Sequence, residues 1–150
     1  MDILDEIPAD HPVAVRLKQI EKDLLTILAN FQDKETGMWY EVIDHVDAPD
    51  NWVKCSVTNL FIYSYAKAIR LGVISKEEFG DILEKAYKGS IYSTYMDEDG
   101  YFVIDKVCIG TCIDEGTYEH YINCAQVKND LHGGAFILMC AEMERYRQKK

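Results

Sequence analysis

The spacing of apolar residues predicts four helices, the first over about residues 12–32. Its apolar side chains recur every three or four positions and form one stripe, while the charged side chains lie off it. Pro12 falls at the helix start, where a missing backbone N–H is tolerated, and Asp10 lies near the same end. The stripe consists of Val13, Leu17, Ile20, Leu24, Ile27, Leu28 and Phe31. We expect an outer, amphipathic helix.

A second helix is predicted over about residues 54–71, and it is apolar on several sides. A helix that is apolar nearly all round is a buried one, so we expect it to be central. Gly72 ends it, because glycine readily adopts the left-handed conformation found after helix C-termini. Its apolar residues are Leu60, Phe61, Ile62, Tyr63, Tyr65, Ala66, Ala68 and Ile69.

The third helix opens at a capping box formed by Ser75 and Glu78, and its apolar positions continue to Ile91. The link of residues 72–75 is short, so the second and third helices should pair as a hairpin. A fourth, strongly apolar helix is predicted over about residues 133–145.

The least regular stretch lies between the third and fourth helices. Residues 97–100, Asp-Glu-Asp-Gly, are typical of a tight turn, and the Tyr-Phe-Val-Ile of residues 101–104 is prone to form a strand. We expect a short β-hairpin there. The predicted fold class is therefore all-α, built of helical hairpins with a short β-hairpin insertion. No low-complexity linker divides the chain, so residues 1–150 should form a single domain.

Length, charge and cysteine content narrow the possible partners and compartment. The 150 residues suffice to bury about two-thirds of the unfolded surface. A net charge of −10 argues against nucleic acid as a partner, because phosphate binding requires clustered Lys and Arg. Five cysteines, an odd number, and an N-terminus without secretory features favour free thiols in the cytoplasm. No apolar run reaches the length of a membrane span.

One segment carries the most informative chemistry, the Thr-Gly-Met-Trp-Tyr-Glu-Val-Ile-Asp of residues 36–44. Trp39, Tyr40 and Asp44 combine flat ring faces with a carboxylate, which suits the binding of a sugar. The alternative is that the two aromatic residues cap a helical core, since large aromatics usually serve packing. Further segments follow in order: Asn51-Trp52 with Ser56, residues 107–111, Tyr118 with Tyr121, and residues 129–136.

In this order the segments resemble the C-terminal half of the unsaturated glucuronyl and rhamnogalacturonyl hydrolases, glycoside hydrolase families 88 and 105. The resemblance is closer to family 105 and runs from about Ile7 to Glu142. It implies part of an (α/α)6 toroid, and a complete toroid is more than twice as long as this chain. Members of these families add water across the C4–C5 double bond of a terminal unsaturated uronic acid, and the implied substrates are pectin-derived disaccharides.

The resemblance also implies which residues would contact such an oligosaccharide. They are Trp39, Tyr40, Asp44, Trp52, Ser56, Thr111, Tyr121 and His132. No residue matches the family's catalytic Asp, which lies in a Trp-x-Asp-x-Leu-x-Met segment of the N-terminal half. Since hydration of the enol ether requires a suitably placed carboxyl group, we assign no catalytic residue and expect the chain alone to be inert. Whether it is an enzyme is left open.

Two departures from the family's sequence pattern weaken the resemblance in the segments that would bind the sugar. Lys54 stands where members of the family often have Glu, and Cys112 replaces the last glycine of a Gly-Thr-Gly ending. Losing that glycine removes a position that readily adopts positive φ.

Three alternatives remain at this stage. Cys108, Cys112, His120 and Cys124 are four possible zinc ligands within seventeen residues, but their spacing lacks the usual close first pair, so we expect no metal and no cofactor. His132 could instead be a satisfied hydrogen-bond partner at a helix start. The whole chain could also be a non-catalytic helical module that binds a partner or a sugar.

An incomplete toroid should leave apolar surface at two flanks. We expect the flanks to be the stripe of the first helix and a cluster of Phe136, Leu138 and Met139 on the last. A soluble protein rarely leaves large apolar patches uncovered. The chain should therefore form a homodimer or pair with the missing N-terminal half.

Overall fold

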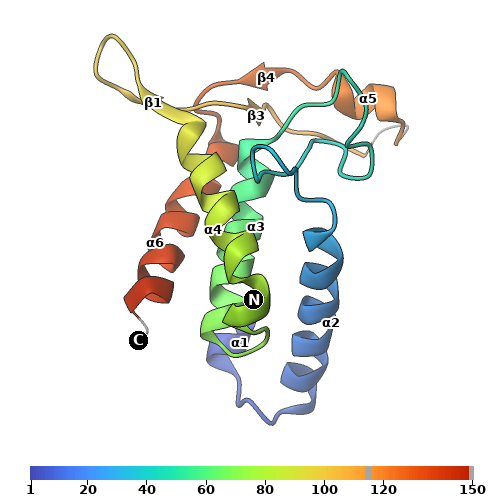
Figure 1. Cartoon of the computed structure of the whole chain (residues 1–150), viewed down its shortest axis with the longest axis vertical. Helices are drawn as coiled ribbons and strands as arrows, with labels where there is room; N and C mark the ends of the chain where they lie inside the picture. Colours follow the sequence, from blue (N-terminus) through green and yellow to red (C-terminus); the bar gives the residue numbers. More distant parts are fainter. Residues whose placement is uncertain (114–115, 149–150) are drawn as a thin grey trace.

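The computed structural model describes residues 1–113 and 116–148, and it is mostly helical (Figure 1). The four longer helices are α2 (Pro12–Ala29), α3 (Cys55–Arg70), α4 (Lys76–Tyr92) and α6 (Ala135–Gln148). Shorter elements are α1 (Ile3–Glu6), α5 (Tyr118–Ile122) and the 3-10 helix η1 (Leu131–Gly134). The four predicted helices are confirmed, although the first ends at Ala29. No helix in this described part of the chain is both long and apolar enough to cross a membrane.

Two small antiparallel strand pairs complete the part of the chain that the structure describes. Strand β1 (Thr94–Met96) pairs with β2 (Phe102–Ile104), which confirms the predicted hairpin. The turn is closed by Asp97, whose side chain accepts hydrogen bonds from the backbone N–H of Asp99 and of Tyr101 at 3.1 and 2.8 Å. The second pair, β3 (Val107–Cys108) with β4 (Gln126–Val127), was not predicted. Each of its strands has only two residues, too few for a periodic pattern.

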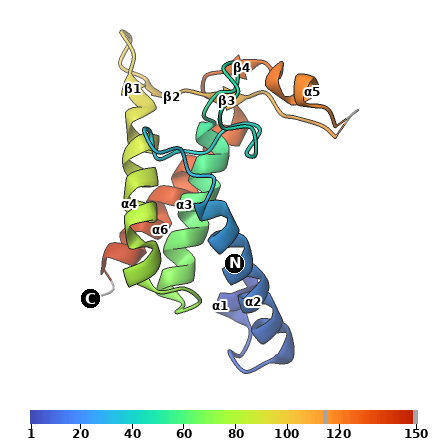
Figure 2. The same cartoon turned by 45° about the vertical axis from the view of Figure 1, so that its right-hand side comes forward.

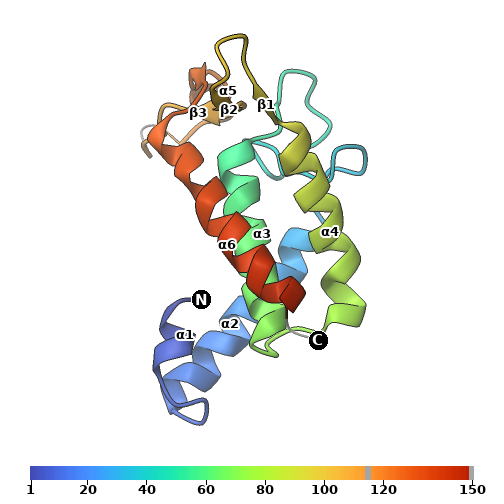
Figure 3. The ribbon, with the colours of Figure 1, turned by 90° about the vertical axis from the view of Figure 1, so that its left-hand side faces the viewer.

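Helix α3 is the central element. Helices α4 and α6 pack on it, and α2 touches it from the opposite flank to α6 (Figures 1 and 2). Figure 3 shows α6 crossing in front of α3, with α4 alongside. Strands β3 and β4, helix α5 and the loop between α2 and α3 gather at one end of the helices in Figures 1 and 2. This loop-rich end brings together most of the segments singled out in the sequence.

The core confirms the burial expected for α3. Ile62, Tyr65, Ala66 and Ala68 are fully buried, whereas Leu60 remains 47% exposed. The α3–α4 hairpin also forms as predicted, and the Ser75 hydroxyl accepts the backbone N–H of Glu78 at 3.2 Å.

Trp39 belongs to this core, and its predicted role as a sugar platform does not fit the structure. The side chain is fully buried. Its indole N–H donates to the carbonyl of Leu28 at 2.8 Å, and its ring meets Phe61 edge-on at 5.2 Å and stacks on Tyr65 at 6.0 Å. Because both ring faces are enclosed, Trp39 serves packing, the alternative considered above.

The two apolar flanks are only partly as expected. On α2, Ile20 and Ile27 are 52% and 56% exposed, while Leu28 packs into the core. On α6, Leu138 is 52% exposed, but Met139 is fully buried, so its predicted place on an open flank is wrong. Met139 instead faces the core cluster around α3.

A network of charged side chains ties α1 and α6 to the far end of α3. The Arg70 guanidinium contacts Glu142 of α6 at 2.5 Å and Asp5 of α1 at 3.3 Å. Lys67, almost completely buried, contacts Asp5 at 2.7 Å and Asp2 at 2.6 Å. The hydrogen bond from Lys67 is the main reason that the pKa of Asp5 lies below its ordinary value.

Replacing Trp39 with Ala should destabilise the fold by about 3–5 kcal/mol, because the change removes a buried indole and leaves a cavity. Urea unfolding followed by far-UV circular dichroism would measure the loss. The matched control is Tyr101→Ala, since Tyr101 is 70% exposed and should change stability by less than about 0.5 kcal/mol. Equal, small effects from both variants would contradict the packing role of Trp39.

Candidate functional site

The loop-rich end contains a hollow of about 290 Å³ that we call the Thr111 pocket. It is lined by Lys54, Ser56, Val57, Leu60, Cys108, Gly110, Thr111 and His132. Three of these residues, Ser56, Thr111 and His132, were singled out in the sequence as candidate sugar contacts. They come from three separate segments, and folding places them around one space.

Backbone hydrogen bonds at the start of α3 hold one wall of the pocket. Residues 40 and 53 form an antiparallel bridge, and Glu41 N–H donates to the Trp52 carbonyl at 2.9 Å. Lys54 N–H donates to the Trp39 carbonyl at 2.8 Å. The buried Trp39 therefore fixes both ends of the loop that leads into α3. In consequence, Glu41 and Lys54 are brought side by side.

Glu41 and Lys54 form an ion pair beside the pocket, with 2.6 Å between Oε2 and Nζ. Their side chains are 3% and 15% exposed. Burial opposes the charged form of Lys54, but hydrogen bonds to Glu41 and Cys108 outweigh it, so the pKa of Lys54 is raised. From the sequence, Lys54 stands out only as a departure from the family pattern, and Glu41 carries no distinguishing signal. Their opposite charges were the available signal, but the twelve residues between them hid the pairing.

Thr111 lies at the centre of a group of polar and sulfur atoms. Its hydroxyl oxygen is 3.4 Å from Cys108 Sγ, 3.4 Å from Cys124 Sγ and 3.5 Å from Glu41 Oε1. Burial would raise the pKa of Cys108, but hydrogen bonds from Thr111 and Lys54 outweigh it and lower the pKa of this thiol. This wall of the pocket thus presents the Thr111 hydroxyl and a Cys108 thiol whose pKa is lowered.

His132 closes the pocket from η1. Its backbone N–H donates to Asp130 Oδ1 at 3.1 Å, and its ring Nδ1 lies 2.5 Å from the same oxygen. These two contacts, the backbone one first, lower the pKa of Asp130. Gly110 has φ of +115°, and a Cβ there would lie 3.2 Å from the His132 ring. The imidazole therefore contacts Asp130 and lies beside a backbone position that favours glycine.

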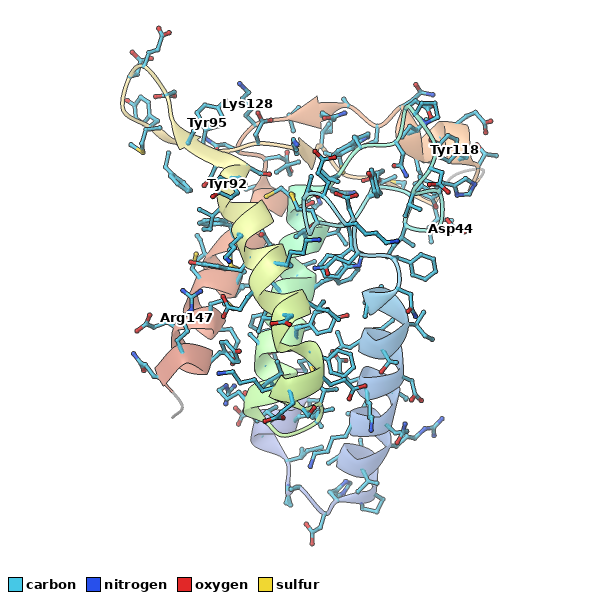
Figure 4. The ribbon with its side chains drawn as sticks, in the orientation of Figure 1. Asp44, Tyr92, Tyr95, Tyr118, Lys128 and Arg147 are labelled. Atoms are coloured by element: carbon cyan, nitrogen blue, oxygen red, sulfur yellow. The ribbon has the colours of Figure 1, made fainter. Side chains whose placement is uncertain are left out.

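The other predicted contacts lie outside the lining of this pocket. The Tyr40 hydroxyl donates to Asp33 at 3.3 Å. Asp44 is 66% exposed and contacts its neighbour His45 at 2.9 Å, and Figure 4 shows it at the edge of the loop-rich end near Tyr118. Trp52 is half-buried, and its indole N–H has no hydrogen-bond partner among the described residues. Tyr121, also half-buried, packs edge-on against the ring of His120 at 5.3 Å.

The four possible zinc ligands do not gather around one point. Cys108 and Cys124 both contact Thr111, whereas a ring nitrogen of His120 is 2.8 Å from the backbone carbonyl of Cys112. Within residues 1–113 and 116–148, no three His, Cys, Asp or Glu side chains are placed to hold a metal ion. All five cysteines are free thiols.

Solved structures share this fold. A family 105 glycoside hydrolase from C. acetobutylicum ATCC 824 superposes with a TM-score of 0.87 and 28% identity, covering 96% of this chain and 42% of that one. A family 88 glycosyl hydrolase from Bacteroides vulgatus has a TM-score of 0.69 at 21% identity, over 96% of this chain and 39% of that one. The second likeness shows the fold alone.

Among curated proteins, the 24.9 kDa protein in the picA locus of Rhizobium radiobacter is 28% identical over 78 residues. The match covers 52% of this chain and 33% of that protein. The chain thus spans less than half the length of the relatives that it matches here. The family model described as Glycosyl Hydrolase Family 88 matches residues 1–147, nearly the whole chain. The chain therefore belongs to glycosyl hydrolase family 88, which confirms the relationship predicted from its ordered motifs.

Proposed function

We propose that this chain is the sugar-binding part of an unsaturated uronyl hydrolase toroid, and that the Thr111 pocket receives the terminal unsaturated uronic acid of a pectin-derived disaccharide. The observation that carries the proposal is the convergence of Ser56, Thr111 and His132 on one hollow. Three residues chosen from the sequence as sugar contacts come from segments up to 76 positions apart, and they share this space. The compartment that we propose for the protein is the cytoplasm.

The chemistry of the pocket suits a monosaccharide ring. The hydroxyls of Ser56 and Thr111 can each donate and accept hydrogen bonds to sugar hydroxyls, and Leu60 offers an apolar surface. With Nδ1 donating to Asp130, His132 presents Nε2 as an acceptor. Lys54 also lines the pocket, where its ammonium group pairs with Glu41 and can donate a further hydrogen bond.

The same geometry argues for an inactive chain. Hydration of the double bond requires a carboxyl group that can donate and accept a proton next to it. The carboxylate that contacts Thr111 is that of Glu41, and Lys54 already neutralises it at 2.6 Å. This chain spans 42% of the family 105 structure. We propose that the catalytic Asp belongs to the remaining part of the toroid.

The purified chain should therefore produce no turnover of unsaturated galacturonyl-rhamnose, followed as loss of ultraviolet absorbance by the C4–C5 double bond. A measurable rate would contradict the proposed inactivity. Comparing Glu41→Gln with Asp44→Asn would then reveal which carboxylate carries it, because Glu41 lies at the pocket and Asp44 does not.

Binding of the same disaccharide should survive in the chain and depend on the pocket. Thr111→Val and His132→Ala should each weaken binding by about tenfold, since each loses a hydrogen bond worth about 1 kcal/mol or slightly more. Isothermal titration calorimetry gives the dissociation constants. Thr26→Val on the exposed face of α2 is the matched control. Unchanged binding in both pocket variants would overturn the assignment of the site.

Exposed apolar residues support a second part of the proposal, that the chain does not act alone. Ile20, Leu24 and Ile27 on α2 are each close to half exposed, and Ile137 of α6 is 72% exposed. A contact that covers these flanks would remove apolar surface from water. We propose that a second copy covers them when the remainder of the toroid is absent.

Sedimentation velocity at micromolar concentration should then show a dimer of the 17.3 kDa chain. Ile20→Glu together with Ile27→Glu should shift the protein to monomer, while Lys22→Glu, a change at an exposed polar position of the same helix, should not. A single monomeric species for the unaltered chain would contradict the dimer.

A further inference from the structure

A second hollow, of about 340 Å³, lies between the C-terminal half of α4 and the loop after α2, and we call it the Tyr92 pocket. It shares no lining residue with the Thr111 pocket. Three lysines line it, Lys85, Lys88 and Lys106, together with one acidic residue, Glu35. The whole chain has 26 acidic and only 16 basic residues. The lining of this pocket is therefore locally basic although the chain as a whole is acidic. A concave surface with an excess of positive charge attracts anions.

The backbone holds this hollow rigidly. A Cβ on Gly89 would lie 2.1 Å from the Thr36 carbonyl oxygen, so the loop presses directly on α4 at a point where no side chain fits. The Lys85 ammonium donates to the carbonyl of Lys34, which joins the same loop to the helix. The floor of the pocket is thus formed by a helix and a loop in direct contact.

Lys106 enters the pocket from an unusual backbone conformation. Its φ is +56°, in the left-handed region that a residue with a side chain rarely adopts. Hydrogen bonds impose it: the Lys106 carbonyl accepts Cys55 N–H at 2.8 Å, and its N–H donates to Asp105 Oδ1 at 2.7 Å. Strained residues of this kind cluster at ligand sites, where they direct a side chain.

An aromatic ring stands beside the lysines. Tyr92 lines the pocket and is 88% exposed, which leaves its ring free to stack (Figure 4). Tyr95 follows three residues later, and the ammonium of Lys128 lies 5.3 Å from its ring centre. The end of α4 thus combines exposed phenol rings with ammonium groups.

We propose that the Tyr92 pocket is a second acidic-sugar site, in which Lys88 and Lys106 bind the carboxylate of a uronate residue and Tyr92 stacks on the sugar ring. Ammonium groups supply donors to a carboxylate, and the flat phenol face suits the apolar face of a pyranose. The choice of a uronate over other anions rests on the proposed function. The pocket itself and its charge do not depend on it.

The test is calorimetric titration of the intact chain with trigalacturonate at low ionic strength. Lys88→Glu should weaken binding at this site at least tenfold, and Tyr92→Ala several-fold. Both side chains are exposed, so neither change should disturb the fold. Lys22→Glu, the same charge reversal at an exposed lysine of α2, should leave binding unchanged. Because the ligand is anionic, the affinity should also fall as salt is raised.

Two further arms separate this proposal from the function proposed above. His132→Ala should not alter the component of binding that Lys88→Glu removes. If His132→Ala weakens binding and Lys88→Glu does not, the Thr111 pocket binds the sugar and the proposal of a second site is wrong. If Lys88→Glu weakens binding and His132→Ala does not, the Tyr92 pocket binds the sugar and the function proposed for the Thr111 pocket is wrong. Inorganic phosphate that competes fully with trigalacturonate, together with no effect of Tyr92→Ala, would overturn the sugar assignment. Equal binding of a neutral trisaccharide of galactose would overturn the role of the lysines.

Discussion

The enclosure of the Trp39 indole between α2 and α3 is the contact on which the loop-rich end depends. Its side chain bonds to the Leu28 carbonyl in the last turns of α2 and packs on Phe61 and Tyr65 of α3. Its backbone carbonyl accepts the N–H of Lys54. One buried ring therefore fixes where the loop leaves α2 and where it enters α3. The positions of Glu41 and Lys54, and with them one wall of the Thr111 pocket, follow from that anchoring.

Basic side chains line both proposed binding pockets although the chain as a whole is acidic. The chain carries a net charge of −10, yet both the Thr111 pocket and the Tyr92 pocket include lysine in their lining. The two environments differ in kind. Lys54 is almost buried and bound to Glu41, so its charge is largely compensated, whereas Lys88 is exposed to solvent. The first arrangement favours a defined geometry, and the second favours attraction at longer range.

The helices could be predicted because the signals that specify them are local. The stripe of α2, the capping Ser75 of α4 and the turn at Asp97 each depend on residues a few positions apart. The site was predictable only in part. Ser56, Thr111 and His132 share a pocket, but which aromatic residues face a ligand is decided by tertiary packing. Trp39 is buried whereas Tyr92 is exposed, and no periodicity in the sequence distinguishes the two residues. The pairing of Glu41 with Lys54 likewise depends on a loop closure that spacing does not encode.

The contacts of Arg70 bear on how this unit can be joined to other chains. By binding both Asp5 and Glu142, this side chain holds the first helix and the last one together at one pole. Figures 1 and 3 show α1 and the C-terminal end of α6 in the half of the molecule away from β3, β4 and α5. A fused domain, a surface tether or a linker closing the chain into a circle can therefore be attached at either terminus without standing over the Thr111 pocket. The fold thus places the points of covalent attachment at one end of the helices and the proposed binding pocket at the other.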